Sequence, residues 1–376
     1  MAELRPLRIP AGSGAYAVRF GPLAGAPRMM RRAGLDPGPA LVVTDTTVAG
    51  LYLRGLTGAL REDGWWPETF AVEPGEGSKS VGTYRALVDW ALAQGITRET
   101  PVVALGGGVV GDLAGFAAAT LLRGLPLMHL PTTVVAQVDS ALGGKTGVNH
   151  ARGKNLIGAF HAPRLVLADW RALRTLAAEE VRAGCAEVVK HGLVADAALA
   201  RHLQLSLGAL LALDPEATPQ VLRDAAAVKA RVVAADEREA GQRALLNFGH
   251  TFGHAIERVA GYGRVLHGEA VAVGMRAALH LSASLRAGRP APPEDPLPEP
   301  FAEADALVRA LGVPTRLDGM DPAALTDAMR TDKKRAASGL RFVVLRGVGE
   351  GFVASGVPPE MTAAAWAYAM RVGGAG

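Results

Sequence analysis

A glycine-rich turn directly after an apolar run is the feature that most constrains this 376-residue chain. Residues 106–111 fit the spacing G-x-G-x-x-G between a buried-strand candidate at 101–105 and an apparent helix. Such a turn lets backbone N–H groups approach a pyrophosphate, and the N-terminus of the following helix favours negative charge. The usual acidic residue about 20 positions on is missing, so we predict a dinucleotide site of variant topology. Ribose contacts are then assigned to Asp45, Glu76 and Lys79, and a plain glycine-rich turn is the alternative.

Further apolar runs indicate the class of fold. Runs at 40–45, 69–74, 127–131 and 164–169 are continuous rather than alternating, which is typical of strands covered on both faces of a parallel sheet. Beyond residue 173 the pattern changes to helices, at 178–194, 219–235, 247–259 and 269–285. We therefore predict an α/β domain over residues 1–173 and a helical domain over residues 174–376, with an exposed proline-rich linker near 287–300.

Composition narrows the functional class. Hydrophobic residues make up 49% of the chain and charged residues 20%, as in an ordinary globular protein. A net charge of +4 without Lys/Arg runs argues against nucleic-acid binding. The N-terminus lacks the order of a signal peptide, and no apolar run is long enough to span a bilayer. A single cysteine, Cys185, excludes an intrachain disulfide, so we expect a soluble cytoplasmic protein.

A histidine cluster in the second half suggests a metal site. Read as a helix, residues 247–259 place His250, His254 and Glu257 on one face, because side chains three and four positions apart are neighbours. His267 follows a turn-like segment at 261–263. Imidazole and carboxylate groups are ligands that zinc and related ions prefer. The alternative is that an HxxxH pair only caps or packs a helix.

Two further segments carry candidate groups. Residues 139–160 show neither helical nor alternating periodicity, and they mix glycines with Asp, Lys and Asn. We interpret them as a functional loop, because ordering a loop costs about 1–2 kcal/mol per residue; a solvated surface loop is the alternative. Farther on, Glu187 and Lys190 stand one helical turn apart. They form an ordinary ion pair, or else Glu187 joins His250 and His267 in a two-His, one-carboxylate set that leaves positions open for substrate.

These segments resemble the 3-dehydroquinate synthases, the shikimate-pathway members of the sugar-phosphate cyclases. The resemblance spans about residues 40–350 and is carried by long ordered motifs, at 106–160, 186–190, 243–257, 266–269 and 332–334. It implies a Rossmann-like NAD-binding domain followed by an all-α metal-binding domain, in a homodimer. It also implies conversion of 3-deoxy-D-arabino-heptulosonate 7-phosphate to 3-dehydroquinate and phosphate. The implied steps are transient oxidation by NAD, phosphate elimination, reduction and aldol closure, with a divalent metal that is zinc or else cobalt.

The resemblance also implies roles for individual residues. The metal ligands are Glu187, His250 and His267, so His254 passes to the substrate side. The substrate or catalytic residues are Lys145, Asn155, Lys190, Lys229, Arg243, Asn247 and His254, with either Lys333 or Lys334, and Arg123 reaches the partner subunit's active site. The cofactor-binding residues are Asp45, Glu76, Lys79, Gly106, Gly107, Gly108, Val109, Asp112, Thr132, Thr133, Asp139, Ser140, Lys154 and Thr175.

Several alternative functions fit parts of this pattern. Valiolone and scyllo-inosose cyclases typically change the positions of Arg243, Asn247 or His254, which here match the dehydroquinate type, whereas aminodehydroquinate synthases preserve nearly the whole pocket. A glycerol-dehydrogenase-like metal alcohol dehydrogenase does not need the dense set of cations. A non-catalytic NAD-binding sensor has no need of the metal set. The proline-rich stretch at 289–296 is longer than the family pattern predicts.

Overall fold

A computed structural model describes residues 4–12, 14–238, 241–261, 263–313, 320–333 and 340–371, with only the backbone at 330–333. The chain divides into two compact units. The first unit comprises Met1–Leu176 together with Lys229–Arg238, and the second comprises Ala177–Val228 and Glu239–Gly376. The predicted division after residue 173 lies close to Leu176, but it does not include the return of the chain at Lys229–Arg238 to the first unit.

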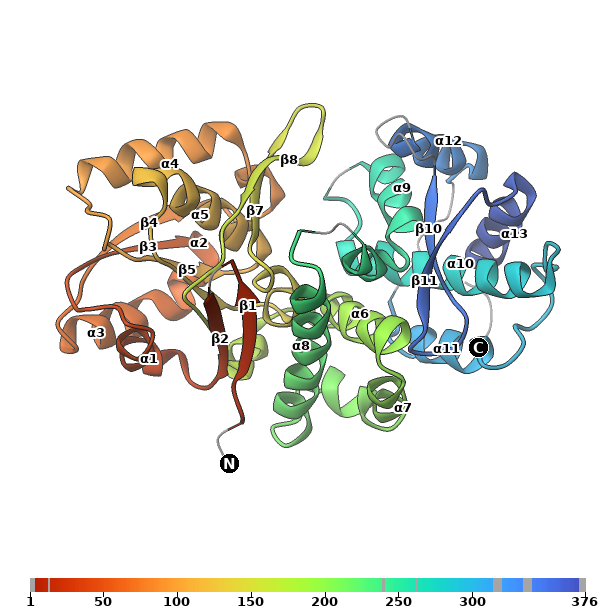
Figure 1. Ribbon diagram of the computed structural model, residues 1–376, viewed down its shortest axis with the longest axis horizontal. Coiled ribbons are helices and arrows are strands. Elements are labelled where there is room, and N and C mark those ends of the chain that lie inside the picture. The colour runs from red at the N-terminus through yellow and green to blue at the C-terminus, as the bar shows by residue number, and fades with distance from the viewer. Residues whose placement is uncertain are drawn as a thin grey trace. The chain divides into compact units, whose positions relative to one another are not determined.

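A seven-stranded sheet forms the centre of the first unit (Figure 1), in the order β1-β2-β9-β6-β5-β3-β4. The strands are β1 (Leu7–Ala11), β2 (Gly14–Phe20), β3 (Pro39–Asp45), β4 (Trp66–Val72), β5 (Val102–Gly106), β6 (Leu127–Pro131) and β9 (Leu165–Ala168). All neighbouring pairs are parallel except β1 with β2. The five predicted strands correspond to β3, β4, β5, β6 and β9. Sequence periodicity missed β1 and β2, which are half exposed.

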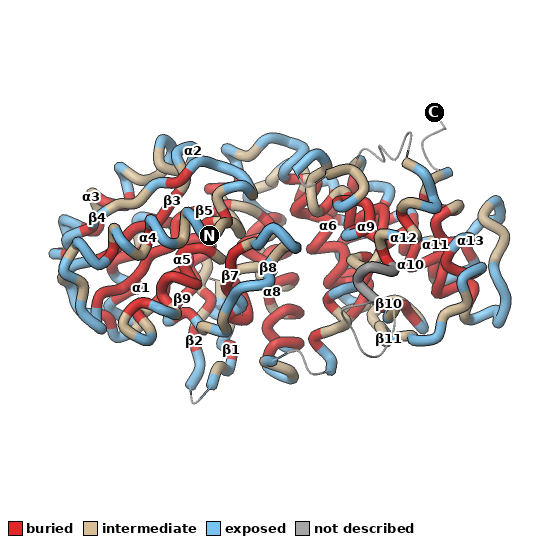
Figure 2. The backbone as a smooth tube through the Cα atoms, turned by 90° about the horizontal axis from the view of Figure 1, so that it is seen from above, coloured by how far each residue is buried: buried red, intermediate tan, exposed pale blue. Residues whose placement is uncertain are grey.

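Helices cover both faces of this sheet, which explains its continuous apolar strands. The helical elements of the first unit are α1 (Ala26–Arg32), α2 (Thr46–Val48), α3 (Arg54–Glu62), α4 (Val81–Ala93) and α5 (Gly108–Thr120), with short turns η1 (Leu23–Gly25), η2 (Ala49–Leu53), η3 (Glu76–Ser78), η4 (Leu121–Arg123), η5 (Ala136–Ser140) and η6 (Trp170–Thr175). One apolar cluster joins α1 and α3 to one face, and a second joins α4 and α5 to the other. Figure 2 shows β3, β9 and α5 as largely buried.

The carboxyl ends of β3, β4, β5, β6 and β9 lie along one edge of the sheet, because these strands are parallel. Asp45 ends β3, Gly106 ends β5, and the segments after β4, β6 and β9 carry the other predicted cofactor groups. Ligands of open α/β sheets bind at this edge. The topology therefore gathers groups that lie far apart in the sequence.

The segment predicted as a loop at 139–160 is mostly a β-hairpin, so that prediction was wrong. Strand β7 (Lys145–His150) pairs with β8 (Gly153–Phe160) in an antiparallel register with an irregularity near Val148. Gly147 faces Gly158 across the pair, and a Cβ at either position would lie 2.6 Å or less from a carbonyl oxygen. These glycines, required by the close approach, remove the alternation by which a strand is recognised.

The second unit is built on α10 (His267–Ala287), which is buried along most of its length. Helices α6 (Ala178–Ala195), α9 (His250–Ala260), α11 (Phe301–Arg309) and α13 (Pro359–Met370) pack on it. The unit also contains α7 (Ala197–Leu211), η7 (Gln242–Asn247), α12 (Pro322–Lys333) and the first part of α8 (Ala217–Ala235). The four predicted helices match α6, α8, α9 and α10. The expectation of a purely helical unit needs a correction, because β10 (Arg341–Leu345) and β11 (Gly351–Ser355) form a hairpin. It packs Phe342 on Phe252 of α9.

The connection between α10 and α11 contains no regular secondary structure, as the proline-rich composition predicted. Among the described residues, no helix is both long and apolar enough to cross a membrane.

Candidate metal centre and cofactor site

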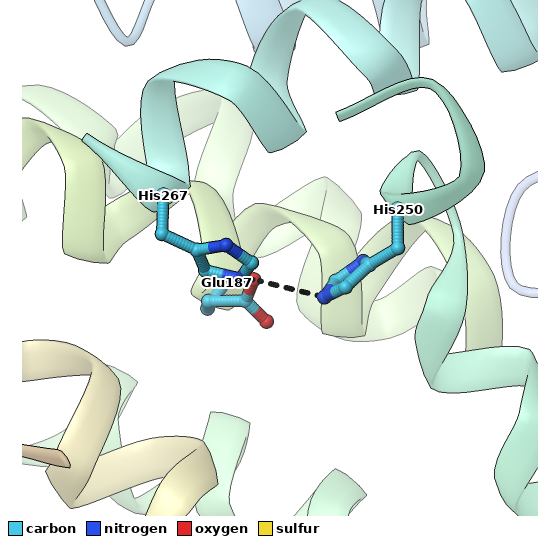
Figure 3. A group of neighbouring side chains, drawn as sticks. All are labelled: Glu187, His250 and His267. Atoms are coloured by element: carbon cyan, nitrogen blue, oxygen red, sulfur yellow. Dashed lines mark ion pairs between the residues drawn. The ribbon is translucent and has the colours of Figure 1, made fainter. Parts of the chain in front are cut away.

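Three helices of the second unit bring together the predicted metal ligands (Figure 3). Glu187 lies on α6, His250 is the first residue of α9, and His267 is the first residue of α10. The Nε2 atom of each histidine lies 3.8 Å from Glu187 Oε1, and one ligand atom from each residue fits within a 4.8 Å group. The two histidines, which follow Glu187 by 63 or more positions in the chain, thus face the same carboxylate group.

Both imidazole rings are oriented by contacts at Nδ1. His250 Nδ1 lies 3.2 Å from the carbonyl oxygen of Phe248, and His267 Nδ1 lies 3.2 Å from Glu257 Oε2. In the tautomer in which Nδ1 donates to these acceptors, Nε2 carries the free lone pair. Each ring therefore presents the same nitrogen to Glu187.

Close helix packing fixes the relative positions of these residues. A Cβ at Gly268 would lie 1.8 Å from the carbonyl oxygen of Ala183 on α6, and a Cβ at Gly274 would lie 2.0 Å from that of Gly249. Only glycine allows α10 to approach α6 and the start of α9 this closely. The distance between His267 and the other two ligands thus depends on backbone contact.

The surroundings act differently on the two histidines. Glu187 is buried and forms an ion pair with Lys190, the i,i+3 partner that the sequence offered. Burial, reinforced by Lys190, holds the pKa of His250 well below its ordinary value. Burial alone would also lower the pKa of His267, but the carboxylates of Glu257 and, less strongly, Glu187 outweigh burial, so that pKa is raised.

The separation of the ligand atoms fits a shared divalent metal. Two ligand atoms, each about 2.1 Å from a tetrahedral ion, lie roughly 3.4 Å apart, so a 3.8 Å separation needs only a small closure. At 3.8 Å the atoms are too distant for hydrogen bonds to one another. A second group, His254, Glu257 and His267, also lies within 4.8 Å and shares His267 with the first.

The glycine turn in the first unit forms a backbone cradle between β5 and α5. A Cβ at Gly106 would lie 2.7 Å from Val110 Cβ, and one at Gly107 would lie 3.0 Å from Thr133 Cγ2. At Gly108 it would lie 3.1 Å from Ser140 Oγ. Side chains are thus excluded where a pyrophosphate would meet the helix N-terminus. The turn also brings the predicted cofactor residues Thr133 and Ser140 into the cradle, with Val109 in the first turn of α5 and Thr132 directly after β6.

Lys79 joins the glycine turn to the β7–β8 hairpin. It is buried, and its Nζ contacts both Asp112 of α5 and Asn155 of β8. Burial raises the pKa of Asp112, although Lys79 acts in the opposite direction. Asn155 was predicted to contact substrate, yet its Oδ1 contacts Lys79, a predicted cofactor residue. Glu76 is tied to the same hairpin, since its Oε1 accepts a hydrogen bond of 2.7 Å from Asn149.

Lys229 of α8 forms an ion pair with Asp139 of η5, both within the first unit. The sequence left open whether Asp139 contacts Lys145 or the cofactor. The structure adds Lys229, a predicted catalytic residue, as a partner. A cofactor-side carboxylate and a catalytic ammonium are therefore adjacent.

The other predicted residues occupy varied places. Asp45 accepts a hydrogen bond of 2.8 Å from the Val48 N–H at the start of α2, and Thr175 Oγ1 lies 2.6 Å from Tyr52 Oη. The remaining residues are Lys145 on β7, Lys154 on β8, Arg123 on η4, Arg243 and Asn247 on η7, and His254 on α9. Lys334 lies outside the described residues, and so does the side chain of Lys333.

Sequence reasoning assigned no role to three features of the site. Glu257 was placed on the histidine face without a partner, Asn149 was not singled out, and the packing role of Gly268 was not foreseen. The spacing of Glu257 to His250 and His254 was the available signal. No local pattern marks a glycine that is required by a distant helix.

Comparison with known proteins identifies the family. Profiles described as 3-dehydroquinate synthase N-terminal and C-terminal match residues 69–183 and 184–335. A 3-dehydroquinate synthase from Salinibacter ruber is 48% identical over 360 residues, which cover 94% of each chain. The chain belongs to the 3-dehydroquinate synthase family. The predicted family, fold class and enzymatic activity are thus confirmed, and the other cyclases and the alcohol dehydrogenase are not favoured.

Solved structures of related cyclases support the same architecture. A 2-epi-5-epi-valiolone synthase from Streptomyces hygroscopicus, with NAD⁺ and Zn²⁺ bound, superposes with a TM-score of 0.84 at 30% identity, covering 95% of this chain and 97% of that one. A 2-deoxy-scyllo-inosose synthase complexed with carbaglucose-6-phosphate, NAD⁺ and Co²⁺ gives 0.84 at 26% identity, with 96% and 99% covered. The 3-dehydroquinate synthase family therefore shares this fold with cyclases of other products.

Proposed function

We propose that this member of the 3-dehydroquinate synthase family converts 3-deoxy-D-arabino-heptulosonate 7-phosphate to 3-dehydroquinate and phosphate, using NAD and a divalent metal. The observation that carries the proposal is the group of Glu187, His250 and His267, with both Nε2 atoms 3.8 Å from one buried carboxylate oxygen. The NAD⁺ and Zn²⁺ or Co²⁺ bound to related cyclases support the choice of cofactors. Zinc is the metal we propose, because two imidazoles and a carboxylate suit it.

The chemistry divides between the bound groups and the chain. When bound, the metal supplies positive charge beside substrate oxygens and NAD supplies a reversible hydride acceptor. Glu187, His250 and His267 hold the ion while leaving part of its coordination sphere open for substrate. The Gly106–Gly108 cradle and the N-terminus of α5 bind the pyrophosphate. Thr132, Thr133, Asp139, Ser140, Lys154 and Thr175 complete the proposed cofactor contacts, together with Asp45, Glu76, Lys79 and Asp112.

The substrate's carboxylate and phosphate require compact cations and hydrogen-bond donors. Every lysine of the chain is among the predicted site residues, whereas basic residues elsewhere are arginines. A lysine ammonium is a small, strongly hydrated charge whose geometry differs from the guanidinium fork. This distribution supports substrate or cofactor roles for Lys145, Lys190 and Lys229. Arg243, Asn247 and His254 are proposed to complete the anion contacts.

A phosphate-release assay with substrate, NAD⁺ and zinc tests the activity. Glu187→Gln and His267→Ala should lose both bound metal and phosphate release while the fold, measured by circular dichroism, is retained. Arg85→Lys, at an exposed helix position, is the matched control and should behave as wild type. An unchanged rate after complete metal removal would contradict the proposal. Net NADH accumulation with a simple polyol would indicate a dehydrogenase instead.

We further propose a homodimer in which Arg123 acts in the partner's active site. Leu122 and Arg123 both have positive φ, 47° and 69°, and Arg123 is exposed, which supports a backbone strained to direct this side chain outward. Mixing inactive Arg123→Ala and Lys145→Ala chains should restore about a quarter of the activity if half of the dimers are mixed. No recovery in a preparation shown by native mass spectrometry to contain mixed dimers would contradict this arrangement.

Two broader assignments complete the proposal. We place cofactor binding in residues 1–173 and the metal and most substrate groups in residues 174–376, with Lys229–Arg238 grouped with the first unit. We also propose a cytoplasmic location, for which the lone buried Cys185 is the support. Cell fractionation of the native host tests the location directly.

A further inference from the structure

A buried carboxylate outside the proposed ligand set contacts one of the ligands. Glu257 lies on α9, and its side chain is only 4% exposed. Its Oε2 atom lies 3.2 Å from Nδ1 of His267. A carboxylate withdrawn from water is costly unless it is paired or hydrogen-bonded. Its position beside His267 therefore calls for a specific purpose.

The contact controls which nitrogen His267 presents. A neutral imidazole carries a proton on one nitrogen and a lone pair on the other, and the acceptor beside the first decides which is which. Because Glu257 accepts at Nδ1, the lone pair lies on Nε2, which is the atom 3.8 Å from Glu187 Oε1. A carboxylate acceptor also increases the basicity of a ligating imidazole.

His267 needs this support more than His250 does. The His267 side chain is 39% exposed, whereas that of His250 is 12% exposed, so packing restrains His267 less. His250 also has an acceptor at Nδ1, but it is the neutral carbonyl of Phe248. Each histidine is the first residue of its helix, where the partial positive charge of the helix N-terminus disfavours donation to a cation, and at His267 the acceptor is an anion. An anionic acceptor offsets that charge.

We infer that Glu257 is a positioning residue that holds His267 in the orientation and tautomer in which Nε2 binds the metal, and that it thereby sets the metal affinity. This inference rests on the proposed metal set. In this role Glu257 acts through His267. Replacement of Glu257 should therefore change metal binding as well as turnover.

A competing role for Glu257 is that of a direct ligand. His254, Glu257 and His267 also lie within 4.8 Å of one another, and an ion held there would contact the carboxylate itself. The variant Glu257→Gln distinguishes the two roles, because its amide can replace the carboxylate in one of them and not in the other. A glutamine oxygen still accepts the Nδ1–H hydrogen bond, whereas it is a much poorer metal ligand than a carboxylate.

The experiment measures zinc affinity of the full-length, metal-free protein by competition with a chromophoric chelator. Glu257→Leu should weaken zinc binding about 10–100-fold, the usual effect of losing such a support. Glu257→Gln should lose clearly less, because its amide oxygen keeps the hydrogen bond. Asp305→Asn is the matched control, since it replaces a buried, hydrogen-bonded carboxylate that pairs with Arg276 in the same unit. Its zinc affinity should equal that of wild type.

A second measurement reads the tautomer. In ¹⁵N spectra of metal-free protein, recorded at a pH at which the His267 ring is neutral, the ring should carry its proton on Nδ1 in wild type and in Glu257→Gln. In Glu257→Leu the ring should show a mixture of tautomers, which a purely structural role would not produce. If Glu257→Leu does not fold, the glutamine variant and Glu257→Asp, whose shorter side chain withdraws the acceptor, provide the same comparison.

Three results would overturn the inference. Wild-type zinc affinity and tautomer in Glu257→Leu would show that the contact has no positioning effect. A loss in Glu257→Gln as complete as that in Glu187→Gln would make Glu257 a ligand. Undiminished zinc binding in both Glu187→Gln and His267→Ala would instead contradict the proposed metal ligands. Failure of the proposed metal set is thus distinguished from failure of the positioning role of Glu257.

Discussion

Lys229 and Asp139 form an ion pair across 90 positions of the chain, because the end of α8 returns to the first unit. Both side chains are largely buried. Removing one partner should therefore destabilise the protein by up to about 3–5 kcal/mol, because the largely buried charge of the other loses this ion pair. In a double-mutant cycle, Lys229→Met and Asp139→Asn together should cost clearly less than the sum of the single changes. Urea unfolding measures this, and additive effects would contradict the pairing.

The glycine at the start of α10 should be intolerant of any side chain. In Gly268→Ala the new Cβ meets the carbonyl oxygen of Ala183, so α10 must shift relative to α6. We expect a loss of stability of at least about 1–3 kcal/mol and weaker zinc binding, because His267 moves with the helix. Gly208→Ala is the control, since nothing lies within 4 Å of its Cβ. Equal zinc affinity in both variants would show that the packing at Gly268 does not affect the metal site.

His129 should make stability fall in mild acid. It is buried on β6 beside Gly111, and burial lowers its pKa to about 4 from an ordinary 6.5. Between these values the unfolded chain binds a proton that the folded chain does not, so the stability present above pH 6.5 is lost as pH falls toward 4. The loss from this group is about 3 kcal/mol. His129→Gln should flatten the pH dependence of the unfolding free energy by this amount, and an unchanged slope would refute it.

His254 should affect turnover and not metal content. It is exposed on α9, one turn after His250, with ring centroids 5.4 Å apart. His254→Ala should reduce phosphate release at least tenfold. If His254 acts as a general acid or base, the reduction should reach about 100-fold. The zinc content measured by mass spectrometry should stay near that of wild type. Loss of zinc would instead favour the group of His254, Glu257 and His267.

Lysine at position 145 should not be replaceable by arginine. Lys145→Arg keeps the charge but replaces a compact ammonium with a larger planar fork. We expect kcat/KM to fall nearly as far as in Lys145→Ala, about tenfold or more, corresponding to at least 1.4 kcal/mol of transition-state stabilisation. Steady-state kinetics measures both variants. Full activity in Lys145→Arg would indicate that only the charge matters.

Much of the fold of the first unit was predictable, because parallel strands covered on both faces are continuously apolar and are separated by helical segments. This pattern predicted β3, β4, β5, β6 and β9 and the glycine turn after β5. It failed for the β7–β8 hairpin, whose paired Gly147 and Gly158 carry no alternating pattern. It also failed for β10 and β11, which form an antiparallel hairpin in an otherwise helical unit.

The residues of the candidate site could be predicted from the sequence, but the contacts between them could not. Residues 250–257 display their histidines and carboxylate at helical spacing, and the lysines mark the predicted anion and cofactor positions. The partners of these residues come from other helices. Glu187 reaches the histidines from α6, and Lys229 reaches Asp139 from the end of α8.

The sequence by itself determined the elements that depend on local periodicity and short-range spacing: the parallel strands, the glycine turn, the helices and the chemical types of the ligands. Only the tertiary structure decided which nitrogen of His267 faces Glu187 and which carboxylate supports it. The physical reason is that these contacts depend on how closely α6, α9 and α10 approach one another. That approach is set by backbone contact at Gly268 and Gly274, and no local pattern in the chain encodes it.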